Sequence, residues 1–184
     1  MKPTIVIAGA GPSAVQHEWH SDVPIMAVSG GYRYVPRMDH FASLDKVMCF
    51  PEWMTNSTRC IKHVPDWSNE SEWLKCPQVH SWQYEEGDAP NFVTGPIRAG
   101  TLRKSNVDDT WHNSLLFAVQ VAPRLGFERL VFVGVDLLGP LVVVSDYLQR
   151  WYPIAAREGI EWVNASPLST LCEWMPEAET AVLA

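Results

Sequence analysis

The chain has 184 residues, of which 47% are hydrophobic and 19% are charged. This length suits a single domain with one core, and the composition is that of a globular protein, not of a disordered or fibrous one. The formal net charge is −7, and because duplex nucleic acid requires a basic face, we expect no duplex nucleic acid partner. No apolar run approaches the roughly 18 residues that span a bilayer. We therefore expect no membrane span. The four cysteines form no Cys-x-x-Cys pair, so we expect reduced thiols and a cytoplasmic location.

Short apolar, β-branched runs in the first part of the chain predict buried parallel strands. Each run stops at glycine or at a polar residue, where a ligand crevice would lie. The runs cover residues 4–8, 25–28 and 41–44. A helix is expected after the first run, from about Ser13.

The segment from about 52 to 109 has no clear period, because Trp, Pro, Asn, Ser and Gly interrupt it. We therefore expect an irregular insertion here. Short strands are predicted around 59–63 and 79–83, and a loop is predicted over 85–100.

Regular patterning returns at Thr110, where apolar residues recur at helical spacing until Gly126 supplies a stop. The remaining predicted elements alternate strand and helix. They are a strand over 130–136, a helix capped by Ser145 and ended by Gly159, a strand over 160–163 and a short helix near 169–174. This alternation predicts an α/β fold in which residues 1–184 form a single Rossmann-like domain, with a mainly parallel sheet and helices on both faces.

The first predicted strand runs into a glycine-rich loop of the Gly-x-Gly-x-x-Ala type, which predicts a nucleotide-binding protein. Gly9 and Gly11 would let the backbone approach a phosphate, Pro12 suits the first helical position, and Ser13 would add a hydroxyl. An NAD site also requires an acidic residue at the end of the second strand. Ser29 occupies that position, so hydride transfer is disfavoured. A tight turn without a ligand is the alternative interpretation.

Polar side chains follow several of the predicted strands and open one of the helices. Ligands of parallel sheets bind beyond the carboxyl ends of the strands, so these side chains are expected to converge on one crevice. For each of these side chains, turn formation or helix capping is the alternative role. The residues are Ser29, Asp45, Asn113, Ser114, Asp136, Asn164 and Ser166.

Five motifs occur in an order that resembles a known group of proteins. They are Ile-Ala-Gly-Ala-Gly-Pro-Ser, Ala-Val-Ser-Gly-Gly-Tyr, an Asn-Ser pair that opens a helix, Val-Phe-Val-Gly-Val-Asp and Val-Asn-Ala-Ser-Pro-Leu-Ser-Thr-Leu. The group joins the bacterial family-42 sialyltransferases to the domain-of-unknown-function family 115 proteins, which include archaeal 6-hydroxymethylpterin diphosphokinases and phage and environmental relatives. The resemblance covers most of the chain and is weak between about 52 and 109.

This resemblance implies a Rossmann-like sheet that binds a CMP-sugar or ATP. By position, Ser29 stands where the group usually has a ribose-contacting Asn. Leu115 replaces the glycine usual after the Asn-Ser pair, and no histidine lies between Asp136 and Asn164, where the sialyltransferases carry their general base. The remaining implied contacts are Gly9, Gly11 and Ser13 to phosphate, Asp45 at the third strand, Asn113 and Ser114 to the nucleotide, and Asn164, Ser166 and Ser169 in the closing element.

The missing histidine limits the chemistry, because deprotonating an acceptor hydroxyl near neutral pH calls for a group that titrates near 7. His112, next to the Asn-Ser pair, is the first choice, and His63 and His80 are the others. Phosphoryl transfer needs less, since Asp45 or Asp136 would hold Mg²⁺.

Three functions remain open from the sequence. The leading hypothesis is a nucleotide-binding transferase that uses a nucleotide-activated sugar of the CMP-sialic acid type, with His112 and Asp136 as its catalytic residues. The first alternative is an ATP-dependent diphosphokinase of the pterin type. The second is a nucleotide-binding module without catalysis.

Overall fold

The computed structural model describes residues 2–19, 22–67, 72–100 and 113–178. A parallel seven-stranded sheet forms its centre, with strand order β5-β4-β3-β2-β1-β8-β9. The predicted α/β fold with a parallel sheet is thereby confirmed. The strands are β1 (Thr4–Ala8), β2 (Ile25–Val28), β3 (His40–Ala42), β4 (Ile61–Pro65), β5 (Val79–Trp82), β8 (Arg129–Val133) and β9 (Glu161–Asn164).

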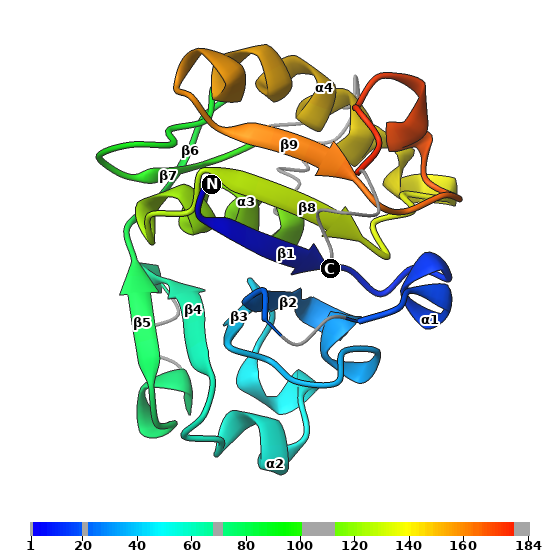
Figure 1. Ribbon diagram of the computed structural model, residues 1–184. Helices are drawn as coiled ribbons and strands as arrows, with labels where there is room; N and C mark the ends of the chain where they lie inside the picture. The colour runs from blue at the N-terminus through cyan, green and yellow to red at the C-terminus, as the bar shows by residue number, and fades with distance from the viewer. Residues whose placement is uncertain (1, 20–21, 68–71, 101–112, 179–184) are drawn as a thin grey trace.

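The strand order reverses direction next to β1. From β1 the chain adds β2 to β5 on one side, and it then crosses to add β8 and β9 on the other. The arrowheads of β1, β8 and β9 point to the same side of the molecule, where α1 lies (Figure 1). In open parallel sheets such a reversal leaves a crevice beyond the carboxyl ends of the strands, so the topology alone places a binding site beside the end of β1.

Helices and turns connect these strands. None of the described helices is long and apolar enough to cross a membrane. The α-helices are α1 (Ser13–Gln16), α2 (Glu52–Thr55), α3 (Ser114–Arg124) and α4 (Val142–Arg157), and short 3₁₀ helices cover Ser29–Arg33, Val47–Cys49, Glu72–Lys75, Gly139–Leu141 and Thr170–Glu173.

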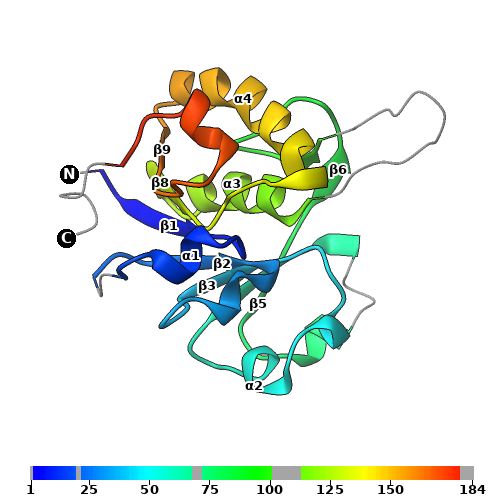
Figure 2. The ribbon, with the colours of Figure 1, turned by 90° about the vertical axis from the view of Figure 1, so that its right-hand side faces the viewer.

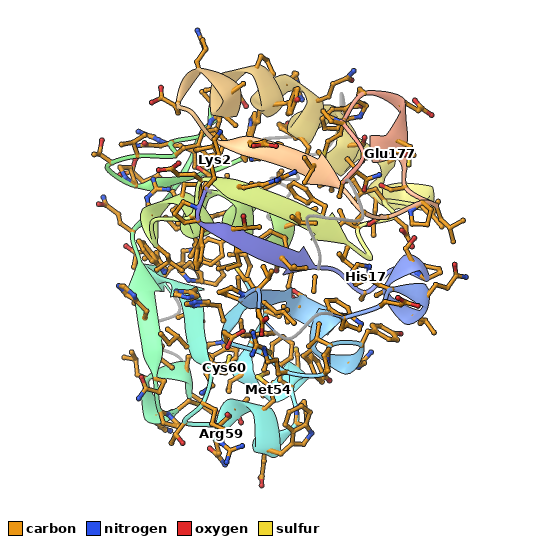
Figure 3. The ribbon with its side chains drawn as sticks, in the orientation of Figure 1. Lys2, His17, Met54, Arg59, Cys60 and Glu177 are labelled. Carbon is orange, nitrogen blue, oxygen red and sulfur yellow. The ribbon has the colours of Figure 1, made fainter. Side chains whose placement is uncertain are left out.

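The two long helices pack on the same face of the sheet. Ile5 and Ile7 of β1 belong to the apolar cluster that contains the buried faces of α3 and α4, and Figure 2 shows these helices lying side by side. Alternate residues of each strand point to the opposite face, which α2 and loops cover instead. There, Met54 of α2 and Cys60 join one buried cluster (Figure 3).

The region expected to be an irregular insertion contributes β4 and β5 to the central sheet. The loop predicted over 85–100 also contains structure, because β6 (Tyr84–Glu86) and β7 (Ile97–Ala99) form a separate parallel pair. These strands have three residues each, so their hydrophobic period is too short to recognise in the sequence.

A buried glutamine on α3 attaches this second sheet to the core. Gln120 has no exposed surface. Its Oε1 accepts hydrogen bonds from the N–H groups of Asn91 and Arg98, both at 3.0 Å, and its Nε2 donates to the carbonyls of Arg98 and Leu116, both at 2.8 Å. One buried side chain therefore bonds to four backbone groups, three of which belong to Asn91 and Arg98.

The predicted helix boundaries differ from the structure at two places. Helix α4 begins at Val142, and Ser145, predicted to cap it, is buried inside it. The chain enters α4 directly from the 3₁₀ turn over Gly139–Leu141, so the helix starts without a polar cap. Helix α3 begins at Ser114 behind an extended Asn113, and the predicted start at Thr110 lies outside the described residues.

Replacing Gln120 with leucine is expected to destabilise the protein strongly. Leucine has a similar volume, but it leaves several buried backbone groups without partners, at about 1–3 kcal/mol for each. Urea unfolding should show a loss of more than about 2 kcal/mol. The same change at the exposed Gln149 of α4 should cost less than about 0.5 kcal/mol, and equal losses at the two positions would contradict the proposed role of Gln120.

Candidate functional site

A cavity of about 450 Å³ lies beyond the carboxyl ends of β1, β2 and β8. This is where the reversal in strand order predicts a ligand site. Eight of the residues that the sequence singles out line it, and Leu137, Leu138 and Leu141 form an apolar part of its wall. The eight are Gly9, Gly11, Pro12, Ser29, Asp45, Asn113, Ser114 and Asp136.

The glycine-rich loop packs against the chain that follows β8. The Gly9 N–H donates to the Val133 carbonyl at 2.8 Å, and the Gly11 N–H donates to the Gly134 carbonyl at 2.7 Å. A Cβ atom on Gly11 would lie 2.5 Å from Asp136 Oδ2 and 2.7 Å from the Gly134 oxygen. The glycines are therefore required for contact between two loops. Carbonyl groups of the protein already accept both of these N–H groups, and the contact of this loop with a phosphate stays a prediction.

Asp136 completes this contact between the loops. Its side chain is buried, with 2% of the residue exposed, and its Oδ2 accepts the Ser13 N–H at 2.8 Å. Ser13 opens α1, so a protein carboxylate occupies the place that the sequence pattern assigns to a phosphate. Asp136 Oδ1 has no hydrogen-bond partner among the described residues. Leu137, the next residue, has a left-handed backbone with φ of 53°, which is a strained conformation for leucine.

Ser29 and Asp45 belong to one hydrogen-bond network at the ends of β2 and β3. Asp45 Oδ2 accepts the Ser29 hydroxyl and the Ser43 hydroxyl, both at 2.9 Å, and the Asp45 carbonyl accepts the Trp73 indole N–H at 3.0 Å. Ser29 has a left-handed backbone, with φ of 43°. The network holds this strained residue at the cavity wall. Ser43 carries no signal of its own in the sequence, because its role depends on partners that only the fold brings to it.

Asn113 and Ser114 combine a structural contact with a place in the cavity wall. Asn113 Oδ1 caps α3 by accepting the Leu115 N–H at 2.8 Å. Ser114 Oγ accepts the Leu44 N–H at 3.0 Å, which ties the start of α3 to the end of β3. Within the described residues the Asn113 amide N–H₂ group makes no hydrogen bond, so it is available to a ligand.

Asn164, Ser166 and Ser169 do not line the cavity. Asn164 Oδ1 accepts the Ser166 N–H at 3.0 Å, which is an Asx turn. Ser166 Oγ accepts the Val135 N–H at 3.1 Å, and Ser169 Oγ caps the last 3₁₀ helix by accepting the Leu171 N–H at 3.1 Å. These side chains are buried and hold the loop that carries Asp136, so their geometry fits the structural alternative.

Comparison with protein-family models gives no match, and comparison with curated proteins gives none. The chain is similar to two solved structures of the sialyltransferase CstII from Campylobacter jejuni. The structure with the substrate analogue CMP-3FNeuAc has a TM-score of 0.61 at 11% identity, over 97% of this chain and 87% of that chain. The structure with cytidine-5′-monophosphate has a TM-score of 0.57 at 12% identity, over 97% and 86%. At such identities the likeness shows a shared fold, and function has to be argued from the site.

None of the histidines in the described ranges lines the cavity, and His112 lies outside those ranges. His40, His63 and His80 instead stand on the neighbouring strands β3, β4 and β5. The Trp82 indole N–H donates to His63 Nδ1 at 3.0 Å, and His63 Nε2 lies 3.0 Å from His40 Nδ1. An indole is only a donor, so neutral His63 carries its proton on Nε2 and donates it to His40.

This arrangement keeps His63 uncharged. His63 is fully buried, and burial, together with the neighbouring rings of His40 and His80, lowers its pKa to about 3. Burial also lowers the pKa of His40, although the carboxylate of Asp39 opposes that change. The geometry makes His63 a structural residue and not a general base for the cavity, which is lined by other segments.

Mild acid is expected to destabilise the protein through His63. Between pH 6.5 and about 3 the unfolded chain binds a proton at this residue and the folded chain does not, so the free energy of unfolding falls as the pH falls, by up to about 1.4 kcal/mol per pH unit. His63→Gln keeps a donor and an acceptor but cannot titrate. Its stability, measured by urea unfolding at a series of pH values, should fall less steeply than that of the parent. The exposed His80→Gln is the control and should keep most of the slope, because burial is the largest cause of the lowered pKa of His63. Equal slopes for His63→Gln and the parent would contradict the assignment.

Proposed function

We propose that the protein binds a nucleotide-activated sugar of the CMP-sialic acid type in this cavity and acts as a transferase. The observation that carries the proposal is the convergence of polar side chains from separate segments, among them Ser29, Asn113 and Asp136, on one cavity at the reversal of the strand order. Similarity of fold to a sialyltransferase solved with CMP and with CMP-3FNeuAc supports the choice of donor.

The roles proposed for the residues follow from their places. The Asn113 amide and the Ser29 and Ser114 hydroxyls face the nucleotide. His112 precedes Asn113 directly in the chain, and we assign it the general-base role. In the transfer, His112 would take the proton of an acceptor hydroxyl while that oxygen bonds to the sugar carbon and the nucleotide leaves with the electrons of the broken C–O bond.

One observation favours a second function, an ATP-dependent diphosphokinase. Two carboxylates, Asp45 and Asp136, line the cavity, and carboxylates are what Mg²⁺ binds beside phosphate groups. Among the described residues no cluster of three or more His, Cys, Asp or Glu side chains could hold a metal ion. A metal here would therefore depend on the nucleotide for most of its remaining ligands.

Two variants of Asn113 separate ligand binding from helix capping. Asn113→Ala removes the cap and the amide, so we expect a loss of stability of about 1 kcal/mol and weaker nucleotide binding, by roughly 1–3 kcal/mol. Asn113→Ser keeps a good cap and removes only the amide. Its melting temperature should therefore match that of the parent, and its affinity for the nucleotide should be lower than that of the parent, as for Asn113→Ala. Calorimetry with CMP and CMP-sialic acid measures the affinity. If Asn113→Ser binds as tightly as the parent, the amide does not contact the ligand.

Turnover tests the chemistry. Because a general base acts in the transition state, His112→Ala should lower sugar transfer by about 10²–10⁴ while leaving donor affinity nearly unchanged. If the protein is instead a diphosphokinase, Asp45→Asn should be the damaging change, and its defect should depend on the Mg²⁺ concentration. Tight nucleotide binding without turnover of either donor would favour a binding module without catalysis.

A further inference from the structure

The glycine-rich loop has the sequence pattern of a phosphate site, but in the structure an acceptor group stands where such a site presents N–H donors. The N–H groups of Gly9 and Gly11 bond to the carbonyls of Val133 and Gly134, and the Ser13 N–H bonds to the Asp136 carboxylate. These three donors are thus satisfied within the protein. What this wall of the cavity offers instead is a carboxylate.

One oxygen of that carboxylate is left over. Asp136 is 2% exposed and lines the cavity, and its Oδ1 is buried without a partner among the described residues. A buried carboxylate oxygen without a donor is unfavourable, and a ligand that brings an N–H or O–H group would satisfy it. A phosphate at the same place would meet a like charge.

We propose that Asp136 Oδ1 selects the ligand by accepting a hydrogen bond from an uncharged donor on the nucleoside, either a ribose hydroxyl or an amino group of the base. The nucleoside end of the nucleotide then lies against the wall formed by Gly9, Gly11 and Asp136, and the phosphate lies away from the glycine-rich loop. This inference rests on the proposed nucleotide-binding function and goes beyond it by giving the orientation of the ligand and the residue that recognises it.

Asp136→Asn is a precise test of this contact, because asparagine has nearly the same shape. Its amide oxygen can still accept the Ser13 N–H, which leaves the N–H₂ group in place of Oδ1. The variant therefore keeps the contact between the loops and turns a cavity acceptor into a donor. Asp146→Asn on the exposed side of α4 removes the same charge at a residue that does not line the cavity, and it serves as the matched control.

Calorimetric titration of the parent and both variants with paired nucleotides measures the selection. CMP and 2′-deoxy-CMP or 3′-deoxy-CMP differ in a ribose hydroxyl, whereas CMP and UMP, or AMP and IMP, exchange a base amino group for a carbonyl. The parent should bind the partner with the donor group roughly tenfold more tightly in one of these pairs. Asp136→Asn should lose that preference if a hydroxyl is recognised, and should reverse it if an amino group is recognised. Asp146→Asn should behave as the parent does.

The outcomes separate this inference from the proposed function. If the parent binds nucleotides but shows no preference in any pair, the inference is wrong and nucleotide binding stands. The same conclusion follows if Asp136→Asn keeps the preferences of the parent. If Asp136→Asn fails to fold, the paired nucleotides still test the inference on the parent, because the absence of a preference in every pair overturns it. If the parent binds none of the nucleotides, both the inference and the proposed function are overturned.

Discussion

The close approach of two backbone segments determines most features of the site. The loop after β1 and the loop after β8 touch through main-chain hydrogen bonds, and a side chain at Gly9, Gly11 or Gly134 would collide with the opposite loop. The Asp136 carboxylate closes the contact from one loop onto the first turn of α1 in the other. Because β1 and β8 are adjacent at the reversal of the strand order, this contact also fixes the floor of the cavity.

The sequence predicted the sheet well where strands are buried on both faces. Residues 4–8 and 25–28 are continuous apolar runs, and the structure has β1 and β2 with these bounds. Such runs are visible because burial on both faces excludes polar residues. The glycine pattern marked a place where two backbone segments meet. Glycine permits any close approach of backbone, and the pattern cannot tell a phosphate from the carbonyl groups of a neighbouring loop.

The remaining misses have tertiary causes. Gln120 stands within an apolar helix face, and only the fold brings Asn91 and Arg98 to its side chain. Asn164 and Ser166 are predicted ligand contacts because polar residues follow a strand there. In the structure the Asn164 side chain bonds within its own loop, to Ser166, and the Ser166 hydroxyl donates to the Phe132 carbonyl of β8. In the sequence, a polar residue at a strand end looks the same whether it faces a ligand or a neighbouring loop. Only its hydrogen bonds in the folded structure distinguish the two roles.

A shared fold leaves the choice of ligand to a few side chains at the strand ends. The cavity wall described here contains two carboxylates, an uncommitted amide on Asn113 and the apolar Leu138 and Leu141, which are 51% and 42% exposed. The described part of that wall has no lysine or arginine. Such a surface favours neutral, hydrogen-bonding groups of a ligand over a phosphate. In the proposed binding mode, the orientation of the ligand therefore depends on the Asp136 carboxylate more than on the glycine-rich loop.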